Sequence, residues 1–225
     1  MGLDIYAHKV SYKVATEKGI ALTNENMNEL FKAMKEESKK EFISKTSKLL
    51  ANLKKVALNT PDKYYDEYPK FIDKLKKLPF YKCYNYHLSA FGFNDYRNEY
   101  LGAKTPTEVE VKLNEDYVEY ALAEDAYFRK VNFIYAFFSN ELYDECCLVD
   151  KTRIKQLIDT CEDVLEHKNN IDYATEHLPT TCGFFFGSTE YDEWYWEDVK
   201  SCLTQMKKLY KKLDDMDMVL WIFSW

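Results

Sequence analysis

The sequence lacks any apolar run long enough to cross a membrane. Its longest apolar tract, Met218 to Phe223, is far shorter than the roughly 20 residues that a membrane-spanning helix needs. The N-terminal residues show no basic stretch followed by an apolar one, so no signal peptide is expected. We therefore expect a protein of the cytoplasm that has no membrane partner.

The sequence also lacks the spacings of metal and disulfide sites. Its six cysteines form no Cys-x-x-Cys pair, and its four histidines show no His-x-x-x-His spacing. Adjacent Cys146 and Cys147 suit neither zinc nor an ordinary disulfide framework. We expect no cofactor and no metal. Only His177, which lies shortly before Gly183, is a candidate acid or base among the histidines.

A basic footprint is missing as well, because the net charge is −7. This balance argues against general nucleic-acid binding, which depends on neutralising phosphates. Residues 113–150 carry nine acidic residues against Arg129 and Lys130 only, whereas residues 23–58 are basic. The Lys-rich stretch contains interspersed glutamates and is typical of a solvated helix face.

The chain contains ample material for a core, since 46% of its 225 residues are hydrophobic. Apolar and polar residues alternate from Tyr6 to Val14, and Met218–Phe223 has the composition of a strand. We predict an α+β, predominantly helical single domain with a small antiparallel sheet that includes both termini.

Apolar spacing of three to four residues predicts most of the helices. The first expected helix begins at Thr23 or Asn24, has a weak point in its apolar pattern near Ser38, and runs to about residue 56. Further helices are expected over about 62–78, 116–140, 151–165 and 190–213. Further strands are expected near 84–93, 108–113 and 146–149, and loops at 15–22, 94–106 and 168–179.

The most distinctive segment runs from Gly183 to Trp196 and contains three consecutive phenylalanines between two glycines. We interpret it as a strand, a turn and a helix start, with Thr189–Asp192 resembling a capping box. Its acidic first turn would repel a phosphate, so a cationic, hydroxyl-rich or protein ligand fits better. A buried strand that enters a well-capped helix explains the same residues equally well.

A second candidate is the stretch from Tyr127 to Asn132, which we expect on one helix. There Arg129, Lys130 and Asn132 are placed to hold a carboxylate or a phosphate. Pairing of the two cations with Glu124, Asp125 or the acidic start of the last helix is the simpler account.

Several of these stretches resemble a family of small bacterial and phage or prophage proteins. The resemblance lies in the opening Met-Gly-Leu-Asp-Ile-Tyr, in Tyr127–Asn132, in the Gly-Phe-Phe-Phe-Gly-Ser-Thr-Glu-Tyr-Asp-Glu-Trp-Tyr run and in the closing Ser-Trp. It implies an accessory protein of phage or mobile-element type and supports Arg129, Lys130, Asn132, Tyr191 and Asp192 as site residues, but it implies no particular reaction. Residues 15–112 fall largely outside the resemblance, which implies a variable helical insertion there and a core over residues 113–225.

The leading functional hypothesis is binding of a protein partner, for which a basic surface is the natural complement. Its expected binding residues are Arg129, Lys130, Asn132, Phe185, Ser188, Thr189, Tyr191, Asp192 and Tyr195. The alternatives are a small enzyme or ligand-binding protein, with a polar pocket at the start of the last helix, and a structural virion or assembly component. A deep concavity lined by Arg129, Tyr191 and Asp192 would favour the pocket, and exposed rings on a flat surface would favour the partner.

Overall fold

The computed structural model describes residues 2–59, 63–78, 84–88, 109–113 and 125–225. The chain divides into two compact units. Unit 1 comprises Met1–Ala33 and Glu124–Trp225, and unit 2 comprises Met34–Ala123. In sequence, unit 2 is therefore inserted into unit 1. The predictions of a single domain and of an insertion at 15–112 remain predictions.

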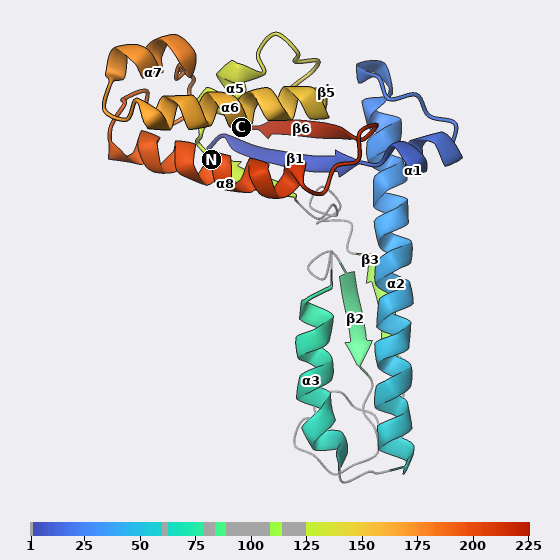
Figure 1. The fold of residues 1–225 in the computed structure, drawn as a ribbon. Helices are drawn as coiled ribbons and strands as arrows, with labels where there is room; N and C mark the ends of the chain where they lie inside the picture. The colour runs from blue at the N-terminus through green and yellow to red at the C-terminus, as the bar shows by residue number, and fades with distance from the viewer. Residues whose placement is uncertain (1, 60–62, 79–83, 89–108, 114–124) are drawn as a thin grey trace. The chain divides into compact units, whose positions relative to one another are not determined.

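Unit 1 is built on a four-stranded antiparallel sheet with the order β4-β1-β6-β5 (Figure 1). Its strands are β1 (Asp4–Val10), β4 (Ala126–Arg129), β5 (Cys146–Asp150) and β6 (Met218–Ser224). Asp4 lies opposite Ser224, so the first and last strands pair along their length. This arrangement confirms the predicted α+β class and the sheet that contains both termini.

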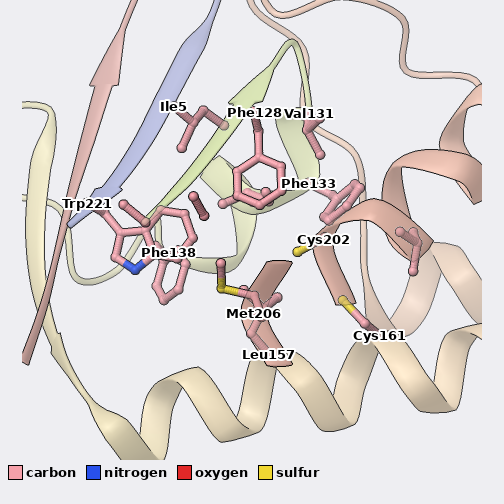
Figure 2. Packing of buried hydrophobic residues seen from close by; sticks show 14 of the residues in the cluster. Ile5, Phe128, Val131, Phe133, Phe138, Leu157, Cys161, Cys202, Met206 and Trp221 are labelled. Carbon is pink, nitrogen blue, oxygen red and sulfur yellow. The ribbon is translucent and has the colours of Figure 1, made fainter. Parts of the chain in front are cut away.

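One face of this sheet forms the core of unit 1 with α6 (Lys151–Glu166) and α8 (Glu193–Tyr210). Because side chains alternate along a strand, Ile5, Phe128 and Trp221 all point to this face (Figure 2). They meet Leu157 of α6 and Met206 of α8, both fully buried. Burying a large apolar side chain contributes about 1.5–3 kcal/mol, so this layer is the main stabilising contact of unit 1.

The opposite face of the sheet is covered at one end by the segment that follows β1. This segment contains α1 (Tyr12–Glu17), η1 (Asn24–Asn26) and the start of α2 (Met27–Asn59). The His8 ring lies 6.4 Å from that of Phe31, and the Leu148 amide donates to Asn24 Oδ1 (3.0 Å). The predicted loop over 15–22 is wrong in its first part, because α1 occupies 12–17.

Unit 2 contains most of α2, together with α3 (Tyr64–Lys76) and the antiparallel hairpin of β2 (Tyr84–Leu88) and β3 (Val109–Leu113). The helices bury Phe42, Leu53, Phe71 and Leu75. α2 continues without interruption through Ser38, so the weak point in its apolar pattern does not break it. The predictions for residues 60–62, 89–108 and 114–124 lie outside the described residues.

Two further predictions of secondary structure are wrong. Residues 126–129 form β4 rather than part of a helix over 116–140, and within 125–140, the part of this range that the structure describes, Asn132–Phe137 (α5) is the only helix. β4 pairs with β1 (Ile5 opposite Phe128), and Lys130 ends the strand at a φ of 62°. In the expected loop over 168–179, Ile171–His177 form α7, capped by the Asn170 side chain.

No helix among the described residues is long and apolar enough to span a membrane.

Candidate functional site

The Gly183–Trp196 segment is a loop followed by a helix, not a strand followed by a helix. Residues 183–192 contain no strand, and α8 begins at Glu193. Asp192, and not Thr189, is the N-cap of α8, because its Oδ1 accepts from the amides of Trp194 (2.9 Å) and Tyr195 (3.2 Å). The predicted capping box is therefore wrong, because it places the N-cap at Thr189, three residues too early. The buried strand that the simpler account expected before the helix is absent from residues 183–192.

The two glycines of this loop have different structural roles. A Cβ on Gly183 would lie 2.6 Å from the Phe186 ring, so the backbone passes directly against a buried aromatic side chain. Gly187 has a φ of 92°, which side-chain-bearing residues rarely adopt. A Cβ there would also lie 3.0 Å from Lys130 Cβ. Both glycines allow the loop to lie close to the turn after β4.

The loop is fastened to unit 1 by the Asn132 side chain, which is buried. Its Nδ2 donates to the carbonyls of Phe186 (3.3 Å) and Ser188 (2.8 Å), and its Oδ1 accepts from the Thr181 amide (3.3 Å). The Leu3 amide donates to the Phe185 carbonyl (2.9 Å), which ties the loop to the N-terminal segment. Asn132 therefore positions the loop, and its predicted role in ligand binding remains a prediction.

This fastening leaves one ring of the triplet in solvent. The Phe186 ring is buried against Tyr135, with a centroid distance of 4.9 Å, and Phe185 is half-buried. Phe184 is 93% exposed and contacts Phe185 edge to face. Trp194, in the first turn of α8, is 79% exposed. These are the two most exposed large apolar side chains among the described residues, and we take them as a candidate interaction surface.

Trp194, but not Phe184, also lines a cavity of about 250 Å³ at the start of α8. Its wall includes four charged side chains, those of Lys130, Glu190, Asp192 and Asp198, and the exposed ring of Trp194. Val131, Asn132, Phe133, Thr180, Gly187, Ser188 and Tyr195 complete it. Three carboxylates against one ammonium make the cavity acidic.

Asp198 is the most perturbed group of this cavity. It is half-buried, and burial, followed by the nearby charge of Asp192, raises its pKa to about 6. At neutral pH it is a carboxylate that has lost part of its hydration. Tyr195, three residues before Asp198 on the same helix, has a structural role, because its hydroxyl donates to the Leu178 carbonyl (2.9 Å). Burial raises the pKa of this hydroxyl.

The predicted site residues separate into several groups. Lys130, Asn132, Ser188, Asp192 and Tyr195 meet at the cavity. Phe185 and Thr189 lie on the same loop, outside the cavity wall. The Thr189 carbonyl accepts from Thr180 Oγ1 (3.0 Å).

The other predicted residues lie elsewhere or have structural roles. Arg129 points away on β4 and pairs loosely with Asp4 (3.8 Å), which corrects its placement beside Lys130 and Asn132 on one helix. The Tyr191 hydroxyl accepts from the Thr180 amide (3.1 Å). His177 does not line the cavity. Its ring packs against that of Tyr173, with a centroid distance of 4.0 Å.

Asp198, Trp194, Glu190 and Phe184 were not among the predicted site residues. Had α8 been started at Asp192, helical spacing would have found Asp198, which is four residues from Trp194 and three from Tyr195 on the same face. The exposure of Phe184 has no sequence signal, because its two neighbours are identical residues with different burial.

A second cavity, of about 420 Å³, lies along β5 and the start of α6. Arg153 forms an ion pair with Glu141 (Nε to Oε1, 2.9 Å), and the Asp150 carboxylate caps α6, but Arg153 Nε and Glu141 Oε2 are buried without a hydrogen-bond partner among the described residues. The first cavity is the better candidate for a ligand because three carboxylates and the mostly exposed Trp194 line it.

Comparison with models of known protein families gives no match, and searches of curated proteins and of solved structures also give none. The function is therefore argued from the site alone.

Proposed function

We propose that the protein is a binding module that recognises a protein partner through an aromatic and acidic surface. This surface, called here the Phe184–Trp194 surface, consists of Phe184, Trp194 and the neighbouring carboxylates Glu190 and Asp198. The observation that carries the proposal is the exposure of Phe184 and Trp194, at 93% and 79%. Buried aromatic anchors supply much of the binding energy at protein interfaces, and Trp is the most enriched of them.

The rigidity of the loop supports this proposal. Phe184 follows Gly183, which lies against the Phe186 ring, and precedes Phe185, whose carbonyl is bonded to Leu3. These contacts fix the backbone on both sides of Phe184 and leave its ring exposed, so less backbone freedom is lost when the ring binds a partner. A ring that was exposed only because its loop is loose would lack this advantage.

The charge of unit 1 indicates the nature of the partner. Unit 1 contains 24 Asp and Glu against 15 Lys and Arg, a net charge of −9. A field of this sign attracts basic partners, raises their association rate and disfavours acidic ones. The proposed partner is therefore a protein with a basic surface, and the phage or mobile-element setting implied by the sequence resemblance remains part of the proposal.

Binding of a small molecule is a second candidate, favoured by the cavity at the start of α8. At about 250 Å³ it is smaller than typical small-molecule sites, which span roughly 300–1,000 Å³. Among the predicted wall residues it includes Asp192 but neither Arg129 nor Tyr191. The exposed rings therefore favour the partner over the pocket.

The test is affinity capture from a bacterial lysate with a Phe184→Ala/Trp194→Ala variant and a matched control, Ile171→Ala/Met216→Ala. The control residues are also exposed apolar side chains of unit 1 (54% and 59%) but lie outside the Phe184–Trp194 surface. We expect one protein to be retained by wild type and control and lost from the Phe184/Trp194 variant. Equal recovery by all three proteins would reject the surface.

A further inference from the structure

Two carboxylates of the cavity, Glu190 and Asp198, have no partner among the described residues, whereas several other charges of unit 1 are paired. Lys151 pairs with Asp215 and Lys212 with Asp125 (2.9 and 2.7 Å). Within the described part of the chain, the side chains of Glu190 and Asp198 accept no hydrogen bond and form no ion pair. Asp192 uses only Oδ1 to cap α8, which leaves Oδ2 available.

Asp198 carries the argument furthest, because it is both half-buried and without a donor in the described residues. Desolvating a carboxylate costs free energy unless a cation or several donors compensate it. The neighbouring carboxylate of Asp192 increases this cost. A cation placed between the two would offset it.

The same cavity offers an aromatic face for a cation. The Trp194 ring belongs to the wall and is mostly exposed. Indole is the best cation–π partner among the side chains, and a desolvated cation gains most from it. The opposing charge is that of Lys130, whose stem lies beside Gly2, where an added Cβ would be 3.0 Å from Lys130 Cε. The four charged side chains of the wall, those of Lys130, Glu190, Asp192 and Asp198, thus give the cavity a net charge of −2.

We propose that this cavity binds the cationic end of a lysine or arginine side chain of the partner, between Asp192, Asp198 and the Trp194 ring. The inference rests on the proposed function and specifies its chemistry. The volume of about 250 Å³ suits one long side chain and not a folded element. The exposed Phe184 ring, on the loop that also supplies Gly187 and Ser188 to the wall, is then free to contact the residues around that side chain.

The test uses the full-length protein and small probes, followed by the Trp194 indole N–H signal in ¹H–¹⁵N spectra. A Trp194→Phe variant assigns the signal, because it removes one of the four tryptophans. The probes are the capped amino acids N-acetyl-lysine methylamide and N-acetyl-arginine methylamide. The uncharged N-acetyl-norleucine methylamide and the bare amine n-butylammonium are compared at the same ionic strength.

We expect saturable shifts of the Trp194 signal with the two cationic capped amino acids and none with norleucine. Asp198→Asn should weaken binding by roughly fivefold, the factor that corresponds to about 1 kcal/mol. The matched control is Asp172→Asn, which removes the same charge from an exposed position on α7. It should bind as wild type does. Unfolding midpoints of all variants are measured first, and the isosteric Asp198→Asn is expected to fold.

Two results would overturn the inference. They are equal binding of norleucine and lysine, and equal weakening by Asp198→Asn and Asp172→Asn. n-Butylammonium is the cationic end of a lysine side chain without its backbone, and we expect it to shift the Trp194 signal as the capped lysine does. These results need no partner protein, so a failed cavity with successful capture rejects this inference alone, and failed capture rejects the proposed function.

Discussion

The Asn132 side chain uses both of its polar atoms to hold the loop that presents Phe184. It satisfies the carbonyls of Phe186 and Ser188 and the amide of Thr181, three groups on two sides of the loop. Its removal leaves the buried Phe186 carbonyl without this donor. The Asn132 amide is thus a main determinant of the loop geometry, together with the bond from the Leu3 amide to the Phe185 carbonyl.

Asn132→Ala should lower the free energy of unfolding by about 2–3 kcal/mol, since it leaves buried backbone groups without partners. Asn140→Ala is the matched control, because Asn140 is exposed and makes no hydrogen bond with the described residues. Urea denaturation measures both. A loss for Asn132→Ala no larger than that of the control would show that the loop is held by other contacts.

Asp198→Asn is expected to stabilise the protein above pH 6. The folded state raises the pKa of Asp198 from 3.8 to about 6, so ionisation there opposes folding. The penalty is absent well below pH 3.8, grows as the pH rises through this range, and is complete above about pH 7. With solvent screening at a half-buried site, the gain should be about 1 kcal/mol.

Denaturation at pH 4.5 and 7.5 tests this expectation. The free energy of unfolding of Asp198→Asn should exceed that of wild type by clearly more at pH 7.5 than at pH 4.5. A constant difference would mean that Asp198 is not perturbed by burial and by Asp192. Such a stabilising substitution at a site residue fits a group retained for binding rather than for stability.

At the scale of elements, side chains close the outer edges of the sheet. On β4, the Tyr127 amide donates to Gln205 Oε1 (3.1 Å) and its carbonyl accepts from Gln205 Nε2 (3.2 Å). On β5, Asn24 and the Tyr143–Cys146 bridge satisfy the outward backbone groups of Leu148 and Cys146. Free edges recruit other strands, so this arrangement disfavours a partner bound by strand addition.

Gln205→Ala should open the β4 edge, and hydrogen exchange of the Tyr127 amide should accelerate about tenfold, as expected when about 1.4 kcal/mol of protection is lost. Lys208→Ala, on the same helix and without a partner in the described residues, is the control and should leave this rate unchanged. Unchanged exchange in Gln205→Ala would show that the edge is protected by β1 pairing alone.

Asp217 joins three elements near the start of β6. Its carboxylate is 3% exposed and contacts Lys9 Nζ (2.7 Å), the Tyr12 amide (3.0 Å) and the Asp214 amide (2.9 Å). Burial alone would raise the pKa of this group, but the hydrogen bonds from Lys9 and from the Asp214 and Tyr12 amides outweigh it and lower the pKa. A lowered folded pKa contributes stability above pH 3.8 that is lost as the pH falls through the folded value.

Asp217→Asn should therefore cost about 2–3 kcal/mol of unfolding free energy at pH 7. The difference in unfolding free energy between Asp217→Asn and wild type should become smaller as the pH is lowered below about 3.8. Asp215→Asn is the control, because its side chain is 96% exposed and its ion pair with Lys151 contributes little. Equal effects of the two substitutions in urea denaturation would contradict this role.

The sequence pattern predicted the terminal strands, α3, α6 and α8, whose alternation or helical spacing extends over several turns or residue pairs. It failed for β4, α1 and α7, each of seven residues or fewer. Short segments show few repeats, so neighbouring residues and long-range contacts decide between strand and helix there. β2, β3 and β5, of five residues each, were nevertheless predicted as strands. For Ala126–Arg129, pairing with β1 decides the conformation, and that contact is far away in sequence.

The same reasoning applies to the site. Unusual composition located the segment around Gly183–Trp196, and five of the nine predicted residues meet at the cavity. Burial and exposure within it were not predictable, because they follow from hydrogen bonds of Asn132 and from the Leu3 backbone. Arg129 and Lys130 are adjacent, yet one belongs to a strand and the other to a turn with positive φ.

For the whole molecule, charge is distributed unevenly between the units. Unit 1 has a net charge of −9, whereas unit 2 carries 16 basic against 14 acidic residues, a net charge of +2. The proposed binding surface thus belongs to the acidic part of the chain. Association with a basic partner should slow as salt is added, since screening shortens the range of attraction to about 8 Å at physiological ionic strength.

The central claim is that the Phe184–Trp194 surface contacts a protein partner. Site-specific photocrosslinking tests it most directly, with p-benzoylphenylalanine in place of Phe184 and, as the control, in place of Ile171. Both positions are exposed, so the probe should fit without disturbing the fold. We predict a crosslink to one basic protein from position 184 and none from position 171. The same crosslinks from both positions, or none from position 184, would contradict the account.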